Sequence, residues 1–214
     1  MDALPVALWF DPLCPFAWMT SRWLHEVARQ RPLDISWRVM SLAIVNEGED
    51  VPAKYRDAYD ASWKALRTLV ATDAAHGSDA VGRLYTALGT RIHLGKRSID
   101  EAMLAECLAE ADLPADLLDA SGDASLDAVV RTSHAASQDA VATRIGTPIL
   151  EVHGRAFFGP VVNPAPSGAE AVALFEALAA LARVPQFAEL KRGRTAELDL
   201  RPPSGSADAG TLAR

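Results

Sequence analysis

Apolar and alternating runs near the start of the chain predict two strands with a helix between them. Residues Val6–Phe10 are apolar and aromatic, which is typical of a buried strand. Residues Leu33–Met40 alternate between apolar and polar positions and predict a second strand. Apolar positions at helical spacing from Met19 to Arg29 predict a helix between the two. The order predicts a βαβ unit with a right-handed crossover, and the polar residues Ser41–Asp50 that follow are expected to form a loop.

From residue 51 to residue 144 the hydrophobic pattern is helical throughout. A Ser with a Glu three residues later, Ser98 and Glu101, predicts a capping box at the start of one helix. Cys107 lies on the apolar face of that helix. The remaining helices are expected near Tyr55–Gly77, near Asp79–Ile92, after Pro114, and over Ser125–Arg144.

The α/β pattern returns in the last third of the chain. Residues Pro148–Val152 and Ala156–Phe158 are strand-like, and the turn between them predicts a hairpin. The Ala- and Leu-rich stretch Gly168–Ala182 predicts a helix. Residues 201–214 are rich in Pro, Gly, Ser and Ala, and residues 196–214 are predicted to form a disordered tail. The whole pattern predicts an α/β domain in two segments, 1–50 and 145–195, interrupted by a helical insertion over 51–144.

Composition narrows the class of protein. The chain has 214 residues, half of them apolar, which is enough for a sizeable core. The net charge of −7 and the lack of a basic block argue against binding of nucleic acid or of anionic membranes. No apolar run has the roughly 18 residues needed to span a bilayer. The chain begins without a signal-peptide pattern, which favours a cytoplasmic protein. The histidines and cysteines have no metal-ligand spacing, so we expect no metal site.

Cys14 is the main candidate for chemistry. It lies where the first strand ends and the first helix begins, and Pro15 suits the first helical position. Helix N-termini present free N–H groups and a partial positive charge, which stabilise a thiolate. Thiols in this position have pKa values of roughly 3.5–7.5, against about 8.5 for a free thiol. We therefore predict a nucleophilic Cys14 with a depressed pKa, the alternative being a small buried apolar residue.

The second cysteine, Cys107, is predicted to be structural. It lies on an apolar helix stripe, so burial with no lowering of its pKa is expected. The alternative is a remote resolving thiol for Cys14, which requires Cα atoms within about 7 Å.

Several separated stretches together resemble a known family. The stretches DPLCPFAWMTSRWL, VMSLAIVNE, LYTALGTRIH, GTPILEVHGRAFFGPV and FAELKRGRT are similar to the DsbA-like branch of the thioredoxin superfamily called mycothiol-dependent nitroreductases. The superfamily's C-x-x-C motif reads Cys14-Pro15-Phe16-Ala17 here, so Ala17 replaces the second cysteine. The resemblance implies a thioredoxin-like fold with an inserted helical cap subdomain. It also implies a cis peptide bond before Pro148, close to Cys14.

We expect the substrate site in the groove between the two parts of the molecule, at the N-terminus of the Cys14 helix, because small-molecule sites favour domain interfaces. No tightly bound cofactor is expected, and a low-molecular-weight thiol, mycothiol or glutathione, is the implied cosubstrate. Arg91 and His93 could together hold an anionic or sugar-bearing substrate. The residues expected to bind substrate are Pro15, Phe16, Ala17, Thr147 and Pro148, with His93, Asn46, Tyr55 and Tyr85 as further candidates.

Three functions remain open at this stage. The first is a monothiol oxidoreductase, in which Cys14 attacks a disulfide and a small thiol releases it; nitro compounds are the other substrate class that the resemblance implies. The second is a thiol transferase or isomerase similar to the kappa-class glutathione transferases, which use a single residue at this helix start. The third is a non-catalytic relative that binds a thiol or peptide at Pro148. The sequence leaves the oligomeric state open.

Overall fold

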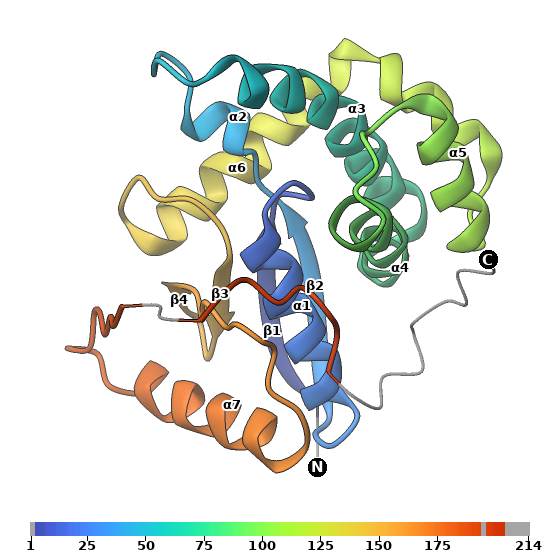
Figure 1. The fold of residues 1–214 in the computed structure, drawn as a ribbon. Coiled ribbons are helices and arrows are strands. Elements are labelled where there is room, and N and C mark those ends of the chain that lie inside the picture. Colours follow the sequence, from blue (N-terminus) through green and yellow to red (C-terminus); the bar gives the residue numbers. More distant parts are fainter. Residues whose placement is uncertain (1–2, 194–195, 204–214) are drawn as a thin grey trace.

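A four-stranded sheet forms one half of the molecule in this computed structural model, which describes residues 3–193 and 196–203 (Figure 1). The strand order is β2-β1-β3-β4. β1 runs parallel to β2 and antiparallel to β3, and β3 and β4 form an antiparallel hairpin. The strands are β1 (Leu4–Phe10), β2 (Leu33–Val39), β3 (Ile149–Val152) and β4 (Arg155–Phe158). The predicted βαβ unit and hairpin are therefore present.

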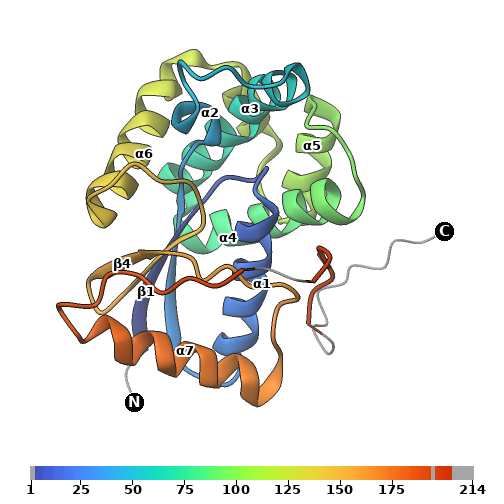
Figure 2. The same ribbon diagram turned by 60° about the vertical axis from the view of Figure 1, so that its left-hand side comes forward.

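Two helices pack against the sheet face that carries Leu8 and Phe10. α1 (Pro15–Ala28) connects β1 to β2, and α7 (Gly168–Ala182) lies beside α1 (Figure 2). The Trp23 indole joins the two helices by donating a hydrogen bond to the carbonyl of Ala171, at 3.0 Å. Because side chains alternate along a strand, Ala7 and Trp9 face the opposite side and form a second, smaller cluster.

All regular elements between β2 and β3 are helical. They are α2 (Leu42–Val45), α3 (Ala53–His76), α4 (Ser78–Gly89), a π-helical turn (Thr90–Leu94), α5 (Glu101–Glu110), two 3₁₀ helices (Ala115–Gly122 and Ala124–Leu126) and α6 (Asp127–Val141). This helical half shares one apolar core with the sheet half. The arrangement is the DsbA-like thioredoxin fold with inserted helices that the resemblance implies.

Two glycines allow the helical half to approach the sheet half closely. A Cβ atom on Gly82 would lie 2.5 Å from the Trp37 ring, and one on Gly89 would lie 2.2 Å from the Trp18 ring. Both distances are too short for any side chain, so glycine is required where α4 packs on these two tryptophans.

The structure corrects two local predictions. The expected loop Ser41–Asp50 contains the short helix α2, because the Ser41 hydroxyl caps it by accepting a hydrogen bond from the Ile44 amide at 3.3 Å. The expected capping box at Ser98 is also wrong. Asp100 is the N-cap of α5 and accepts a hydrogen bond from the Met103 amide at 2.7 Å.

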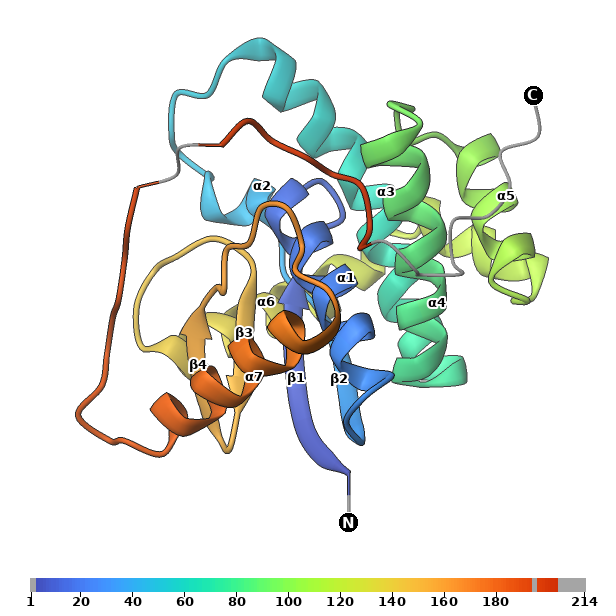
Figure 3. The ribbon, with the colours of Figure 1, turned by 60° about the horizontal axis from the view of Figure 1, so that its bottom comes forward.

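Residues 196–203, the first part of the predicted tail, form neither a helix nor a strand. These residues run across the molecule in an extended path, over α1 (Figure 3). The Leu200 carbonyl accepts a hydrogen bond from the Trp18 indole at 3.1 Å, and Pro203 is buried. The remainder of the predicted tail, 204–214, lies outside the described residues.

Candidate thiol site

Cys14 lies at the N-cap of α1. Its backbone is extended, and Pro15 is the first helical residue, as the sequence predicts. The Sγ atom accepts a hydrogen bond from the Ala17 amide at 3.4 Å, and the Cys14 carbonyl accepts from the Trp18 amide at 3.0 Å. The sulfur thus occupies the place that an Asp or Ser side chain takes in an ordinary helix cap. Position 17, one turn into the helix, offers only a backbone N–H.

The loop that contains Thr147, distant in the sequence, covers the other side of the Cys14 sulfur. The Cys14 thiol donates to the Thr147 carbonyl at 3.3 Å, although the two residues are 133 positions apart. The Thr147 hydroxyl in turn donates to the Trp9 carbonyl at 2.9 Å, which fixes the loop to β1. The Thr147–Pro148 peptide bond is cis, as the resemblance implies.

The predicted depression of the Cys14 pKa is wrong in this arrangement. Burial raises the pKa of the thiol to about 11, since only 5% of the residue is exposed. The Ala17 and Phe16 amides lower the pKa, and the charge of Asp11 raises it further. Desolvation disfavours the charged form and here outweighs the hydrogen bonds at the helix start. Cys14 is therefore a neutral thiol at pH 7 in this conformation.

Asp11 is a site residue that the sequence reasoning missed. It is fully buried, and its carboxylate accepts hydrogen bonds from the Leu13 amide at 2.8 Å and from the Leu42 amide at 2.7 Å. These bonds connect the Cys14 loop to the start of α2. Burial raises the pKa of this carboxyl to about 6, against the lowering effect of the two amides. The available signal was an acidic residue directly after a buried strand, three positions before Cys14.

His93 is buried beneath the Cys14 loop and does not line a groove, contrary to prediction. Its Nε2 atom lies 2.9 Å from the Pro12 carbonyl, and its ring stacks on Trp18 with centroids 5.7 Å apart. Burial lowers the pKa of His93 to about 4, so the ring is neutral at pH 7. A carbonyl only accepts, so Nε2 must carry the proton.

Tyr85 is also misplaced by the sequence prediction. It is fully buried and stacks on Phe10, with centroids 3.7 Å apart, so it cannot contact a substrate in a surface groove. Its hydroxyl has no hydrogen-bond partner within the described part of the chain.

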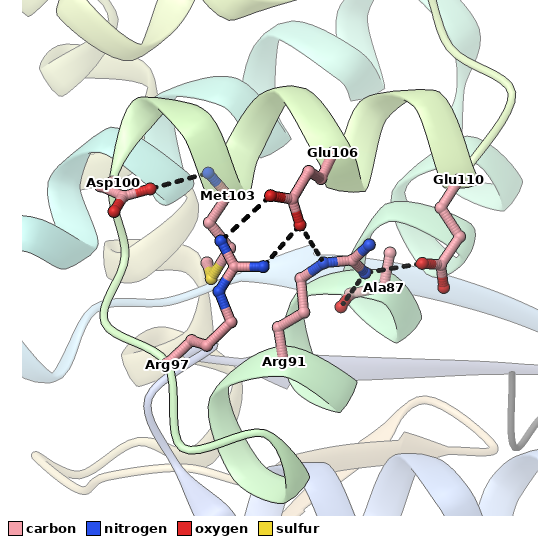
Figure 4. Close-up of polar contacts among 7 residues, drawn as sticks. All are labelled: Ala87, Arg91, Arg97, Asp100, Met103, Glu106 and Glu110. Carbon is pink, nitrogen blue, oxygen red and sulfur yellow. Dashed lines mark hydrogen bonds and ion pairs between the residues drawn. The ribbon is translucent and has the colours of Figure 1, made fainter. Parts of the chain in front are cut away.

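Arg91 belongs to an ion-pair network instead of a substrate site (Figure 4). Its guanidinium contacts Glu110 at 2.6 Å and Glu106 at 3.2 Å, both on α5. Arg97 pairs with the same Glu106 at 2.5 Å. The π-helical turn thus sends His93 toward the Cys14 loop and Arg91 toward α5.

Asn46 lines a pocket of about 310 Å³ between α2 and α3. Its amide donates to the Leu42 carbonyl at 2.7 Å and to the Tyr59 hydroxyl at 3.2 Å. Tyr59, which the sequence reasoning did not single out, also lines this pocket, and burial together with the charge of Asp11 raises its pKa. Tyr55 is half exposed and stacks on Tyr59, with centroids 6.4 Å apart. α2, which contributes Ala43 to the wall of this pocket, is joined to the Cys14 loop by the hydrogen bond that the Leu42 amide donates to Asp11.

Cys107 is fully buried on α5, as predicted, and both cysteines are free thiols. Burial raises the pKa of Cys107 to about 12. Met103, Leu104 and Leu108 are buried on the same helix.

Within residues 3–193 and 196–203, no helix is long and apolar enough to cross a membrane. The same residues contain no group of three His, Cys, Asp or Glu side chains placed to hold a metal ion.

A single cysteine capping the first helix of a thioredoxin-like fold, facing a cis-proline loop, defines a DsbA-like protein of the thioredoxin superfamily. Comparison with family models specifies it further. Residues 13–192 match the family model described as "Rv2466c-like: Mycothiol-dependent nitroreductase Rv2466c". The chain belongs to this family, and its membership supports a thiol-based redox function.

Three known proteins illustrate the likeness. A protein of Mycobacterium tuberculosis (strain ATCC 25618 / H37Rv), named "Uncharacterized protein Rv2286c", is 31% identical over 188 residues, which cover 87% of this chain and 80% of that protein. The cytosolic disulfide reductase DsbM from Pseudomonas aeruginosa with GSH is 18% identical with a TM-score of 0.57, covering 82% of this chain and 98% of that chain. A 2-hydroxychromene-2-carboxylate isomerase is 14% identical with a TM-score of 0.58, covering 85% and 96%. At these identities, the two solved structures show a shared fold only.

Proposed function

We propose that the protein is a monothiol thiol–disulfide oxidoreductase with Cys14 as its nucleophile and a small thiol, mycothiol first among the candidates, as the resolving partner. The observation that carries the proposal is the placement of Cys14 Sγ between the Ala17 amide and the Thr147 carbonyl. Family membership supports the thiol chemistry and the cosubstrate. Ala17, which supplies only a backbone amide, supports the monothiol mechanism.

The exchange needs one protein thiol. The Cys14 sulfur attacks the disulfide between a small thiol and its partner molecule. A bond forms between Cys14 and the small thiol, and the partner leaves as a thiolate that takes up a proton. A second small thiol then attacks this mixed disulfide, which frees Cys14 and forms the symmetric disulfide of the small thiol.

The same pair of thiols can balance the reduction of a nitro compound. Conversion of a nitro group to a nitroso group and water takes two electrons and two protons. Cys14 and one small thiol supply both by forming their mixed disulfide, and a second small thiol then releases Cys14 as before. The pocket beside Asn46 and Tyr59 is where we place the non-reacting part of the substrate, because α2, which forms one wall of this pocket, is joined to the Cys14 loop by the hydrogen bond from Leu42 to Asp11.

Intact mass spectrometry tests the proposal directly. The protein is incubated with oxidised mycothiol and, separately, with oxidised glutathione, and adducts are assigned by peptide mass. We expect one adduct, on Cys14, in the wild type and in Cys107→Ser, and none in Cys14→Ser. A protein that takes no adduct, or takes it on Cys107, would contradict the monothiol mechanism.

The raised pKa of Cys14 favours one second candidate, a thiol transferase or isomerase. In that function the neutral Cys14 donates a hydrogen bond to the thiolate of a bound small thiol and forms no disulfide itself. A serine hydroxyl can make the same bond. Cys14→Ser would then keep transferase or isomerase activity within about tenfold, the cost expected of a weakened hydrogen bond. Disulfide exchange by the same variant would disappear.

A further inference from the structure

The segment 196–203 is attached to α1 and to the loop before α7 by side chains that hydrogen-bond to its backbone. The Trp18 indole donates to the Leu200 carbonyl at 3.1 Å. The Asn163 amide donates to the Glu197 carbonyl at 2.7 Å and accepts from the Asp199 amide at 2.7 Å. Leu200 packs against the core and Pro203 is buried. The segment is thus held by three hydrogen bonds and an apolar contact, while Glu197 and Arg201 face solvent.

Trp18 connects this segment to the reactive thiol. Its amide closes the first turn of α1 on the Cys14 carbonyl, and its ring stacks on His93, which holds the Pro12 carbonyl of the Cys14 loop. The Arg22 guanidinium lies over the same ring at 4.2 Å. Any force that fixes the Trp18 indole therefore also fixes the loop and the helix start that bury Cys14.

The attachment is incomplete, which makes release feasible. A cavity of about 240 Å³ remains between α1, the π-helical turn and the segment, with Pro202 and Pro203 in its wall. Contacts across a cavity are lost, so the segment is held less tightly than a packed core element. The family match ends at residue 192, before the segment begins. The family model therefore gives no account of it.

We propose that residues 196–203 act as a brace that keeps Cys14 in its closed, buried position, and that release of the brace opens the thiol to solvent and substrate. The proposal adds regulation to the thiol site and so rests on the proposed function for its meaning. The brace itself is measured without any thiol cosubstrate.

The test compares two truncations of the full chain. One ends after residue 203, which leaves the brace in place, and the other ends after residue 195, which removes it. Alkylation of each cysteine by iodoacetamide at pH 7.5 is followed by peptide mass. We expect the shorter protein to alkylate Cys14 about tenfold faster than the wild type, since loss of a local contact raises the population of locally open states. The protein that ends after residue 203 should alkylate Cys14 at a rate within about twofold of the wild type. Cys107 should remain unreactive in both truncated proteins.

Asn163→Ala provides a second measurement in the full-length chain. It removes the two hydrogen bonds to Glu197 and Asp199 and should accelerate Cys14 alkylation in the same direction, by about threefold. If the protein that ends after residue 195 does not fold, the alkylation rate of Asn163→Ala alone tests the proposal. Rates within twofold of the wild type in both variants overturn the proposal. So do equal increases at Cys14 and Cys107, which report general loosening, or equal rates in the two truncations. A missing mycothiol adduct would instead count against the proposed function and leave these rates unaffected.

Discussion

The surroundings of Cys14 and of Cys107 differ although both thiols are buried and both have raised pKa values. Cys14 is held at a helix start by Ala17 in the same turn and by Thr147 from a distant loop. Cys107 lies in the middle of α5 on an apolar stripe. A small loop movement can expose the first thiol, whereas the second requires a helix to leave its neighbours. Burial therefore does not distinguish the two thiols, and the elements that cover each of them do.

The carboxylates near the two thiols differ in the same way. Asp11, near Cys14, is buried with no cation in its hydrogen bonds, and its pKa is raised. Glu106, one position before Cys107, is exposed, and its hydrogen bonds to Arg97 and Arg91 lower its pKa. One site thus retains a buried charge that the other avoids. Buried charges without a partner are costly and concentrate at functional sites.

Native-state alkylation should show the largest difference between the two thiols. Cys14 needs only local opening, while Cys107 needs the helical half to unfold, so we expect Cys14 to react at least about 1000-fold faster at pH 7.5. For both thiols the apparent pKa of alkylation should lie above the value of about 8.5 for a free thiol. Peptide mass after timed quenching gives both rates. Equal alkylation rates for Cys14 and Cys107 would show that the two thiols do not differ in accessibility. An apparent pKa below 7 for Cys14 would support the pKa depression that the helix start predicts.

The pH dependence of stability should be the next largest effect. The folded pKa of Asp11, about 6, is raised above its ordinary value of 3.8. The carboxyl therefore contributes stability below pH 3.8, and this contribution is lost as pH rises through 6. A shift of about two units corresponds to about 3 kcal/mol. Buried histidines such as His93, whose pKa is lowered, make the stability of both proteins rise with pH over the same range. Urea unfolding at pH 4, 5 and 6, followed by tryptophan fluorescence, should therefore show the wild type losing stability relative to Asp11→Asn as the pH rises.

The control for Asp11 is Glu106→Gln, near the other thiol. The pKa of Glu106 is lowered, so its ion pairs stabilise the protein above its ordinary pKa, and this contribution is lost as pH falls. The control should therefore change the profile in the opposite sense. Parallel profiles for wild type and Asp11→Asn would show that Asp11 does not titrate in this range.

Ala17→Cys should convert the Cys14 site into a dithiol site. The Ala17 amide already contacts Cys14 Sγ at 3.4 Å, so a thiol here lies one turn along, within reach of the first sulfur. Ala17 is fully buried, so overpacking by the added sulfur should cost about 1–3 kcal/mol, more than helix propensity alone predicts. Without added reductant, the mixed disulfide of the variant should resolve at least about tenfold faster than that of the wild type.

Intact mass against time measures the lifetime of this adduct, and Ala17→Ser is the control of equal size without a thiol. If the wild-type mixed disulfide resolves as fast as that of Ala17→Cys, another group in the protein resolves it. Cys107, the other cysteine, would then be the first residue to test, and the monothiol mechanism would be contradicted.

Substitutions of His93 and Arg91 in the π-helical turn should have the smallest effects on alkylation. Each should affect a different thiol. His93→Phe keeps the stack on Trp18 but leaves the Pro12 carbonyl unpaired, at a cost of about 1–2 kcal/mol, and should accelerate alkylation of Cys14. His93→Gln retains an N–H donor and should lie closer to the wild type. Arg91→Gln weakens the pairs to α5 and should accelerate Cys107 only.

Unfolding in urea and alkylation by peptide mass check the variants of the π-helical turn together. An equal response of both cysteines to His93→Phe and to Arg91→Gln would show that the turn does not serve the two regions separately.

Local sequence signals determined most of the elements. The boundaries of α7 match the predicted Gly168–Ala182, because a long Ala- and Leu-rich stretch needs no distant partner to favour a helix. Pro15 marked the first helical residue, because its ring and its missing N–H suit only that position within a helix. The helical spacing of apolar residues over 51–144 predicted the inserted helices. The resemblance supplied the placement of Thr147–Pro148 beside Cys14.

Only the tertiary structure decided how the site behaves. The pKa of Cys14 depends on burial by segments far apart in the chain. The sequence around the helix start does not show the desolvation cost that this burial places on the thiolate. His93 and Tyr85 were expected to line a groove, but both are buried in the core. The direction of their side chains depends on how α4 and the π-helical turn pack on Trp18 and Phe10. The segment 196–203 alternates apolar and charged residues and then ends in two prolines, a pattern that does not show what it contacts. Its position comes from hydrogen bonds to Trp18 and Asn163, which lie elsewhere in the chain and meet it only in the folded molecule.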